Sequence, residues 1–213
     1  MPGRRAYSLR YNFAAEHASH RLRAAGIASF FRPQQLARAG LTRDQLPSLI
    51  SHRVVARVAR GLYRMVDDTT NPYVPPDPLT MACVRVPGSV VCVLSALHVH
   101  GIATVAPPQV WLGIPHSARC PRLQQLHVHI IRFSGAAWSY GVERTEIAGV
   151  PARITSPART VADCCRLASA LGTQVAVTAF REALERQIVS YSELVRVQQA
   201  VPSRRLRALL ETL

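Results

Sequence analysis

The sequence predicts an α+β protein made of a small N-terminal domain, a linker and a larger C-terminal domain. Three observations support this class. Residues 31–64 show helical spacing of apolar residues followed by a period-two pattern, residues 65–79 hold four prolines and three aspartates, and the later sequence is patterned as strands first and helices last. We therefore expect domains at 1–66 and 80–213, separated by a linker at 67–79.

The first helix of the N-terminal domain is expected from Pro33. Proline suits the first turn of a helix because its ring fixes φ and its missing amide would have no partner there. Phe31, Leu36 and Ala39 form an apolar stripe, and Gly40 is suited to end the helix.

A second helix is expected to follow within a few residues. Thr42 can cap it, and the helix would begin at about Arg43. Its buried side is expected to comprise Leu41, Leu46, Leu49 and Ile50. The short turn between the two helices predicts a helix-turn-helix.

From Arg53 the pattern changes to period two, which indicates a short hairpin. Gly61 is available for its tight turn. Apolar residues alternate with arginines, namely Val54, Val55, Val58 and Leu62 among Arg53, Arg57, Arg60 and Arg64. A basic hairpin after two helices predicts a winged helix-turn-helix.

Three positions depart from the simplest form of this motif. Arg32 stands where a Ser or Thr cap is usual, so we expect a loose helix start at a cost of ~1 kcal/mol. Pro47 requires that the second helix begin later, near Asp44, or that it be kinked. The turn into the hairpin uses Ser51 and His52 instead of glycine, so His52 is expected to take a left-handed conformation.

The charge is concentrated in the N-terminal third. The chain carries a net charge of +14, and residues 1–66 hold twelve arginines against two acidic residues, a net +10, which leaves +4 for the other 147 residues. The complete absence of lysine suggests a compositional preference for arginine, but such a preference does not explain the asymmetry. A field of one sign favours a polyanionic partner.

The C-terminal domain reads as strands followed by helices. Ser95 is expected to cap a short helix that ends at Gly101. Strands are expected at Gln109–Ile114 and Leu126–Phe133, and a hairpin at Glu143–Thr155 turning near Ala148-Gly149. Helices are then expected from Ser156-Pro157 to Ala168, and at Gln174–Gln187, Ser192–Gln199 and Ser203–Leu213.

The sequence offers little for catalysis, and we expect neither a catalytic residue nor a cofactor. It has no Gly-rich phosphate loop, no GxSxG and no HExxH, and its five cysteines lack CxxC spacing, so buried free thiols are the default. In a strand, His127 and His129 would lie on one face as a metal site requires, whereas His98 and His100 at a helix end would not. We expect no metal site; the alternative is a metal-dependent nucleic-acid-processing module that uses His127 and His129.

Four separated segments resemble the AbiEi family of antitoxins and transcriptional autoregulators of type IV toxin-antitoxin (abortive infection) loci. The segments are FRPQQLARAGLTRDQL, RVVARVARGLYR, LSALHVHGI and GVPARITSPARTVADCCR. The resemblance implies a winged helix-turn-helix that binds inverted repeats in its own promoter. It also implies a C-terminal domain that counters a nucleotidyltransferase-like toxin without forming a stable complex. Because no apolar run approaches a membrane span and no secretion signal is present, we expect a cytoplasmic protein.

Nine residues are candidates for these functions. Base edges of double-stranded DNA could be reached by Arg43, Gln45 and Ser48, which lie off the apolar face, while phosphates or the minor groove could be reached by Arg53, Arg57, Arg60 and Arg64. The alternative is a protein-interaction scaffold that uses the same basic face. Arg159 and Asp163, four residues apart after Ser156-Pro157, are either antitoxin residues or a structural ion pair.

Overall fold

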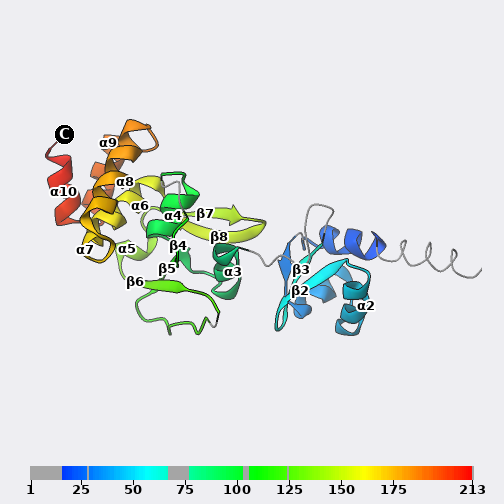
Figure 1. Cartoon of the computed structure of the whole chain (residues 1–213). Coiled ribbons are helices and arrows are strands. Elements are labelled where there is room, and N and C mark those ends of the chain that lie inside the picture. Colours follow the sequence, from blue (N-terminus) through cyan, green and yellow to red (C-terminus); the bar gives the residue numbers. More distant parts are fainter. Residues whose placement is uncertain (1–15, 28, 67–76, 103–105, 124, 213) are drawn as a thin grey trace, which may run out of the picture. The chain divides into compact units, whose positions relative to one another are not determined.

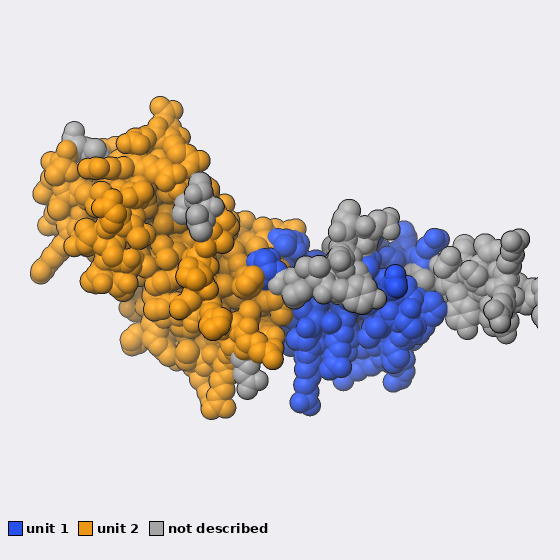
Figure 2. Space-filling model, in the orientation of Figure 1, with its two compact units in different colours: residues 1–77, 148–150 blue, residues 78–147, 151–213 orange. Residues whose placement is uncertain are grey.

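The computed structural model describes residues 16–27, 29–66, 77–102, 106–123 and 125–212. The fold is α+β, with a small three-stranded antiparallel sheet near the N-terminus, a five-stranded mixed sheet, and helices gathered toward the C-terminus (Figure 1). Contacts divide the chain into two compact units, residues 1–77 with 148–150 and residues 78–147 with 151–213 (Figure 2). We call them the N-terminal and C-terminal units. Residues 1–15 of the expected arm and 67–76 of the expected linker lie outside the described residues.

The N-terminal unit follows the order helix, strand, two helices and hairpin. Its elements are a helix at residues 16–24, β1 (Phe30–Phe31), the 3-10 helices η1 (Pro33–Ala39) and η2 (Arg43–Gln45), α2 (Leu46–Ser51), β2 (Val55–Ala59) and β3 (Leu62–Met65). The antiparallel sheet has the order β1-β3-β2. One apolar core joins the helices to one face of this sheet and includes Leu22, Phe31, Leu36, Leu46, Leu49, Val55 and Met65.

The first expected helix is present as the 3-10 helix η1, and its ends are well satisfied. Arg32 provides no side-chain cap, as its position in the sequence indicated, but its own amide donates to Oε1 of Gln35 at 2.7 Å. The stability cost of the missing Ser or Thr cap stays a prediction. Gly40 ends it as predicted, in the left-handed region at φ 64°, and the amide of Leu41 donates to the carbonyl of Leu36.

The second helix begins later than its cap suggested. Gln45 Oε1 accepts the Thr42 amide at 2.8 Å, and a single 3-10 turn, Arg43–Gln45, follows. The α-helical part starts only at Leu46, which places Pro47 in the first turn, where its missing amide is harmless. Of the two outcomes expected from Pro47, the later start is the observed one, two residues beyond the predicted position.

The chain leaves α2 through a left-handed residue, but that residue is Arg53 rather than His52. Arg53 has φ 57° whereas His52 has φ −88°. The amides of Arg53 and Val54 donate to the carbonyls of Ile50 and Leu49, the paired bonds of a Schellman motif. Leu49 and Val54 are buried, but Ile50 is 38% exposed, so its predicted place on the buried side is wrong.

The C-terminal unit combines the mixed sheet with eight helices among its described residues. Its strands are β4 (Val90–Val91), β5 (Val110–Pro115), β6 (Val128–Phe133), β7 (Val142–Ile147) and β8 (Val150–Thr155). Its helices are α3 (Pro78–Arg85), α4 (Val93–Val99), α5 (Ala136–Ser139), α6 (Pro157–Arg166), α7 (Ala168–Leu171), α8 (Thr173–Glu185), α9 (Tyr191–Ala200) and α10 (Arg204–Leu210). The strand order is β6-β5-β4-β8-β7, in which β4 runs parallel to β8 and antiparallel to β5.

Most expected elements of this unit are present within about two residues of their predicted bounds. The hairpin turns at Ala148-Gly149, both at positive φ, as a two-residue connection requires. The cap predicted for α4 is wrong, because Cys92 occupies that position. Ser95 lies inside the helix, buried, and its hydroxyl accepts the Trp111 amide at 2.9 Å.

Helix α6 is the centre of the C-terminal unit. It contacts α4, α8, α9 and α10, and all its residues from Ala158 to Cys165 are buried. Its start is fixed as the sequence predicts, because the Ser156 hydroxyl accepts the Arg159 amide and Pro157 follows at the first helical position. Among the described residues, no helix is both long and apolar enough to cross a membrane.

Candidate nucleic-acid interface

Positive charge dominates the described surface of the N-terminal unit. Residues 16–27 and 29–66 contain nine arginines, against Glu16 and Asp44 as the only acids in these ranges. One of these arginines is engaged within the unit, because Arg21 donates to the carbonyls of Ala39 and Gly40 at 2.9 and 2.6 Å. The others define where a polyanion could be held.

The three residues predicted to read bases are all exposed, but two are partly committed to the helix itself. Gln45 uses its carbonyl oxygen to accept the Thr42 amide. The Ser48 carbonyl accepts from the Ser51 hydroxyl at 2.9 Å, and the Ser48 hydroxyl stands 3.4 Å from Nδ1 of His52. The long donors that remain there are the Arg43 guanidinium and the side-chain amide nitrogen of Gln45.

Strand register separates the four predicted hairpin arginines. Val55 pairs with Met65 and Arg57 pairs with Tyr63, so these four residues share one face of the hairpin. Val55 and Met65 belong to the core under α2, and Arg57 therefore lies on the side of the sheet that carries α2. Arg64 points to the opposite face and is half-buried, so the structure does not bring it together with Arg57.

The other three arginines follow one another along the exposed part of this segment. Arg53 is the left-handed residue after α2, Arg57 lies in β2, and Arg60 lies at the tip, where Ala59 pairs with Leu62. All three side chains are exposed. We call Arg53, Arg57 and Arg60 the hairpin arginines.

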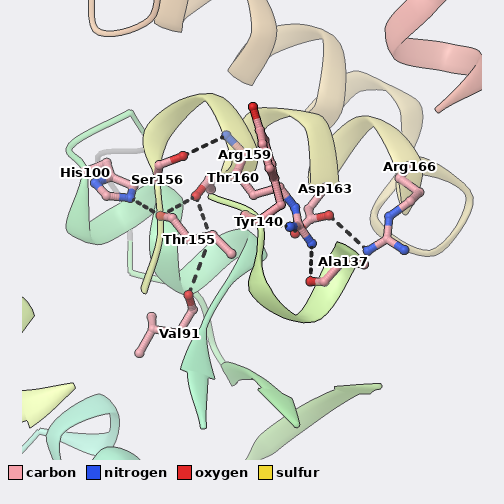
Figure 3. Close-up of polar contacts among 10 residues, drawn as sticks. All are labelled: Val91, His100, Ala137, Tyr140, Thr155, Ser156, Arg159, Thr160, Asp163 and Arg166. Atoms are coloured by element: carbon pink, nitrogen blue, oxygen red, sulfur yellow. Dashed lines mark hydrogen bonds and ion pairs between the residues drawn. The ribbon is translucent and has the colours of Figure 1, made fainter. Parts of the chain in front are cut away.

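Arg159 and Asp163 lie in the interior of the C-terminal unit (Figure 3). Their side chains are 0% and 1% exposed, and Arg159 Nε lies 3.1 Å from Asp163 Oδ2 as an ion pair without hydrogen-bond alignment. Arg159 Nη1 and Nη2 donate to the carbonyls of Tyr140 and Ala137 at 2.6 and 2.8 Å. Arg166 donates to the second carboxylate oxygen of Asp163 at 2.9 Å.

This network joins α6 to the segment around α5. The guanidinium groups of Arg159 and Arg166 also lie over the ring of Phe133, at 5.3 and 5.5 Å from its centre. A partner protein cannot touch Arg159 or Asp163 without opening this core. Their spacing predicted the pair, but the carbonyls of Tyr140 and Ala137 come from a distant segment that no local pattern signals.

The histidines serve separate local purposes. His100 donates through Nε2 to the Thr155 carbonyl at 2.7 Å, and the His129 ring stacks on Trp111 at 4.0 Å between centres. His127 is exposed. Within the described part of the chain, no three His, Cys, Asp or Glu side chains are grouped so that they could hold a metal ion.

Four of the five cysteines are buried, as expected, and Cys120 is exposed. Burial raises the pKa of Cys92 and Cys164 well above the ordinary value and raises that of Cys165 to about 12, because a thiolate would lose its hydration in the core. These thiols are core residues, as predicted for Cys164-Cys165.

No protein-family model matches the chain, and no curated protein shows a significant match.

Proposed function

We propose that the protein is a DNA-binding transcriptional regulator whose N-terminal unit is a winged helix-turn-helix. The observation that carries the proposal is the exposure of Arg53, Arg57 and Arg60 along a hairpin that directly follows the second of two short helices. The order helix, β1, two helices and hairpin, with the sheet order β1-β3-β2, is the arrangement expected of that motif.

Charge supports duplex DNA over a protein partner. From Gln45 to Val66 the sequence contains four arginines and no acidic residue. Because this stretch has no carboxylate, it would not repel phosphates, and its arginines would release counterions from a duplex on binding. A protein-interaction scaffold does not require this one-sidedness.

We further propose that the regulator is an antitoxin of the AbiEi type, active in the cytoplasm and without enzymatic activity. It would bind inverted repeats in its own promoter, and its C-terminal unit would counteract a nucleotidyltransferase-like toxin without a stable complex. The resemblance in four segments supports this. Since Arg159 and Asp163 are internal, we assign them to the stability of that unit rather than to contact with a toxin.

Binding of the full chain to duplexes taken from upstream of its own gene, compared with scrambled duplexes of equal composition, tests the regulator. We expect tighter binding to the upstream duplex by about tenfold or more at physiological salt. Equal and weak binding to every duplex would argue against a sequence-specific repressor, and absence of duplex binding would leave the scaffold alternative.

Growth rescue tests the antitoxin. Co-expression with a nucleotidyltransferase-like protein encoded by the adjacent gene should restore the growth that this toxin suppresses. The rescue should persist when Arg53 and Arg57 are both changed to Gln, since these residues lie in the N-terminal unit. Failure of the wild-type chain to rescue growth would refute the antitoxin assignment and leave the regulator untouched.

A further inference from the structure

Helix α2 presents few groups that could distinguish bases. Its exposed side chains are those of Pro47, Ser48, Ile50 and Ser51. The Ser51 hydroxyl already donates to the Ser48 carbonyl. Bases in the major groove are usually read by Arg, Lys, Asn or Gln through paired hydrogen bonds, and α2 carries none of these.

The 3-10 turn before α2 adds little to this. Gln45 has its acceptor oxygen engaged by the Thr42 amide. Arg43 is exposed, but the carboxylate of Asp44 is its immediate neighbour in sequence. This end of the helix keeps the Arg43 guanidinium and the amide nitrogen of Gln45 as donors, but the Gln45 oxygen that would complete a paired contact with adenine already accepts the Thr42 amide.

The hairpin tip has the opposite character, because it is narrow and ends in one long cation. Ala59 and Gly61 flank Arg60 in the sequence, and Gly61 has φ 69°, which favours glycine over residues with larger side chains. Leu62, the next residue, is buried. Arg60 is therefore the only large exposed side chain of the two-residue turn.

A tip of this shape matches the minor groove. That groove is about 6 Å wide in B-form DNA and narrows further in A·T-rich tracts, where its negative potential attracts inserted arginines. Arg57 lies three residues behind the tip on the α2 side of the sheet, and Arg53 lies at the base of the hairpin. Both side chains are exposed and lie behind the tip along the same segment, so they could meet the phosphate backbone next to an inserted Arg60.

We infer that this protein reads duplex DNA mainly through the minor groove, with Arg60 inserted at A·T-rich sequence and Arg53 and Arg57 on flanking phosphates. In this arrangement α2 positions the unit against the duplex and does not choose the sequence. The inference rests on the proposed function. It moves base reading from Arg43, Gln45 and Ser48 to the hairpin tip.

Duplexes with inosine separate the two grooves. An I·C pair presents the major groove of G·C, but it lacks the guanine 2-amino group and so resembles A·T in the minor groove. Binding of the full chain to three duplexes that are identical except for a central six-pair tract of A·T, G·C or I·C can be measured by fluorescence anisotropy. We expect equal affinity for A·T and I·C, and at least about fivefold weaker binding to G·C.

Two variants assign the preference to its residue. Arg60→Ala should abolish the difference among the three duplexes, whereas Arg43→Ala should weaken all three and keep the difference. Arg181→Ala, at an exposed arginine of α8, is the matched control and should change nothing.

The outcomes separate this inference from the proposed function. Duplex binding in which I·C behaves like G·C, or in which Arg43→Ala removes the preference, would overturn the minor-groove inference alone. Equal binding to all three duplexes would overturn it as well. Absence of binding to any duplex would overturn the proposed function together with it.

Discussion

The buried ion pair allows a stability prediction that separates a structural role from a contact role. Changing Arg159 to Ala removes two hydrogen bonds to carbonyls, at 2.6 and 2.8 Å, and strips Asp163 of the partner 3.1 Å away. Breaking a buried pair from one side typically costs about 3–5 kcal/mol, because a charge is left in the core. Arg166 still holds the other oxygen of Asp163. We therefore expect the lower part of that range, about 3 kcal/mol.

Urea unfolding followed by tryptophan fluorescence measures this directly. Both tryptophans, Trp111 and Trp138, lie in the C-terminal unit, so the signal reports that unit alone. The matched comparison is Arg186→Ala, at an arginine that is 49% exposed. This change removes another i,i+4 ion pair, to Glu182 at 2.6 Å, and a hydrogen bond to the Gly101 carbonyl at 2.6 Å. That change should cost no more than about 1 kcal/mol. A loss below about 1 kcal/mol for Arg159→Ala would refute the structural role.

Three further predictions concern the same unit. Because Cys120 is the one exposed cysteine, Ellman's reagent should react rapidly with one thiol of the native protein and with none in Cys120→Ser; rapid reaction of several thiols would contradict the burial of the others. The raised pKa of Cys165, about 12 against an ordinary 9, stabilises the folded state below pH 9, and this stability is lost as pH rises toward 12. Between pH 9 and 11 the free energy of unfolding should therefore fall more steeply in wild type than in Cys165→Ala, by about 1.4 kcal/mol per pH unit, and identical slopes would show that this thiol is not shielded. Gly141→Ala would place a Cβ 2.9 Å from Cβ of Arg159 at φ 63°, so it should destabilise the unit more than Gly101→Ala, which has similar φ and open space; equal losses in urea unfolding would rule out the steric effect.

The local start and stop signals of the N-terminal unit were readable in the sequence. Gly40 ended the first helix, and Pro47 marked a late start for the second. The left-handed residue after α2 lies one position later than the sequence predicts, because a Schellman motif places this residue by counting from the last helical hydrogen bond. The identity of the residues that follow does not fix that position. The conformation therefore falls on Arg53 even though histidine is a common residue in that region.

Apolar alternation could not predict on which face of the hairpin Arg57 and Arg64 lie. Both faces of the hairpin carry buried residues, with Val55 on one and Leu62 on the other, so the pattern does not identify an outer side. The register shift between Arg57 and Ala59 then changes the parity along β2. As a result Arg64 and Arg57 lie on opposite faces of the hairpin, and neither feature can be read from the hydrophobic pattern.

In the C-terminal unit, apolar periodicity and the Gly, Pro and cap residues at element ends predicted most strands and helices, because these signals act locally in the sequence. The burial of Arg159 has no such cause. Its guanidinium is accepted by carbonyls about twenty residues earlier in the chain, and only the fold brings these together with α6. An i,i+4 spacing of Arg and Asp looks the same in a surface pair and in a buried one.

The salt dependence of duplex binding tests most directly whether the hairpin arginines hold DNA. If they do, changing Arg53 and Arg57 together to Gln should reduce the slope of log Kobs against log salt concentration by about 1.8 in magnitude. This is about 0.9 for each phosphate that is no longer neutralised. The change should weaken binding to A·T-rich and G·C-rich duplexes alike. The same double change at the exposed Arg181 and Arg207 should leave the slope as in wild type. An unchanged slope in the Arg53 and Arg57 variant, or equal flattening in both variants, would contradict the assignment of DNA binding to the hairpin arginines.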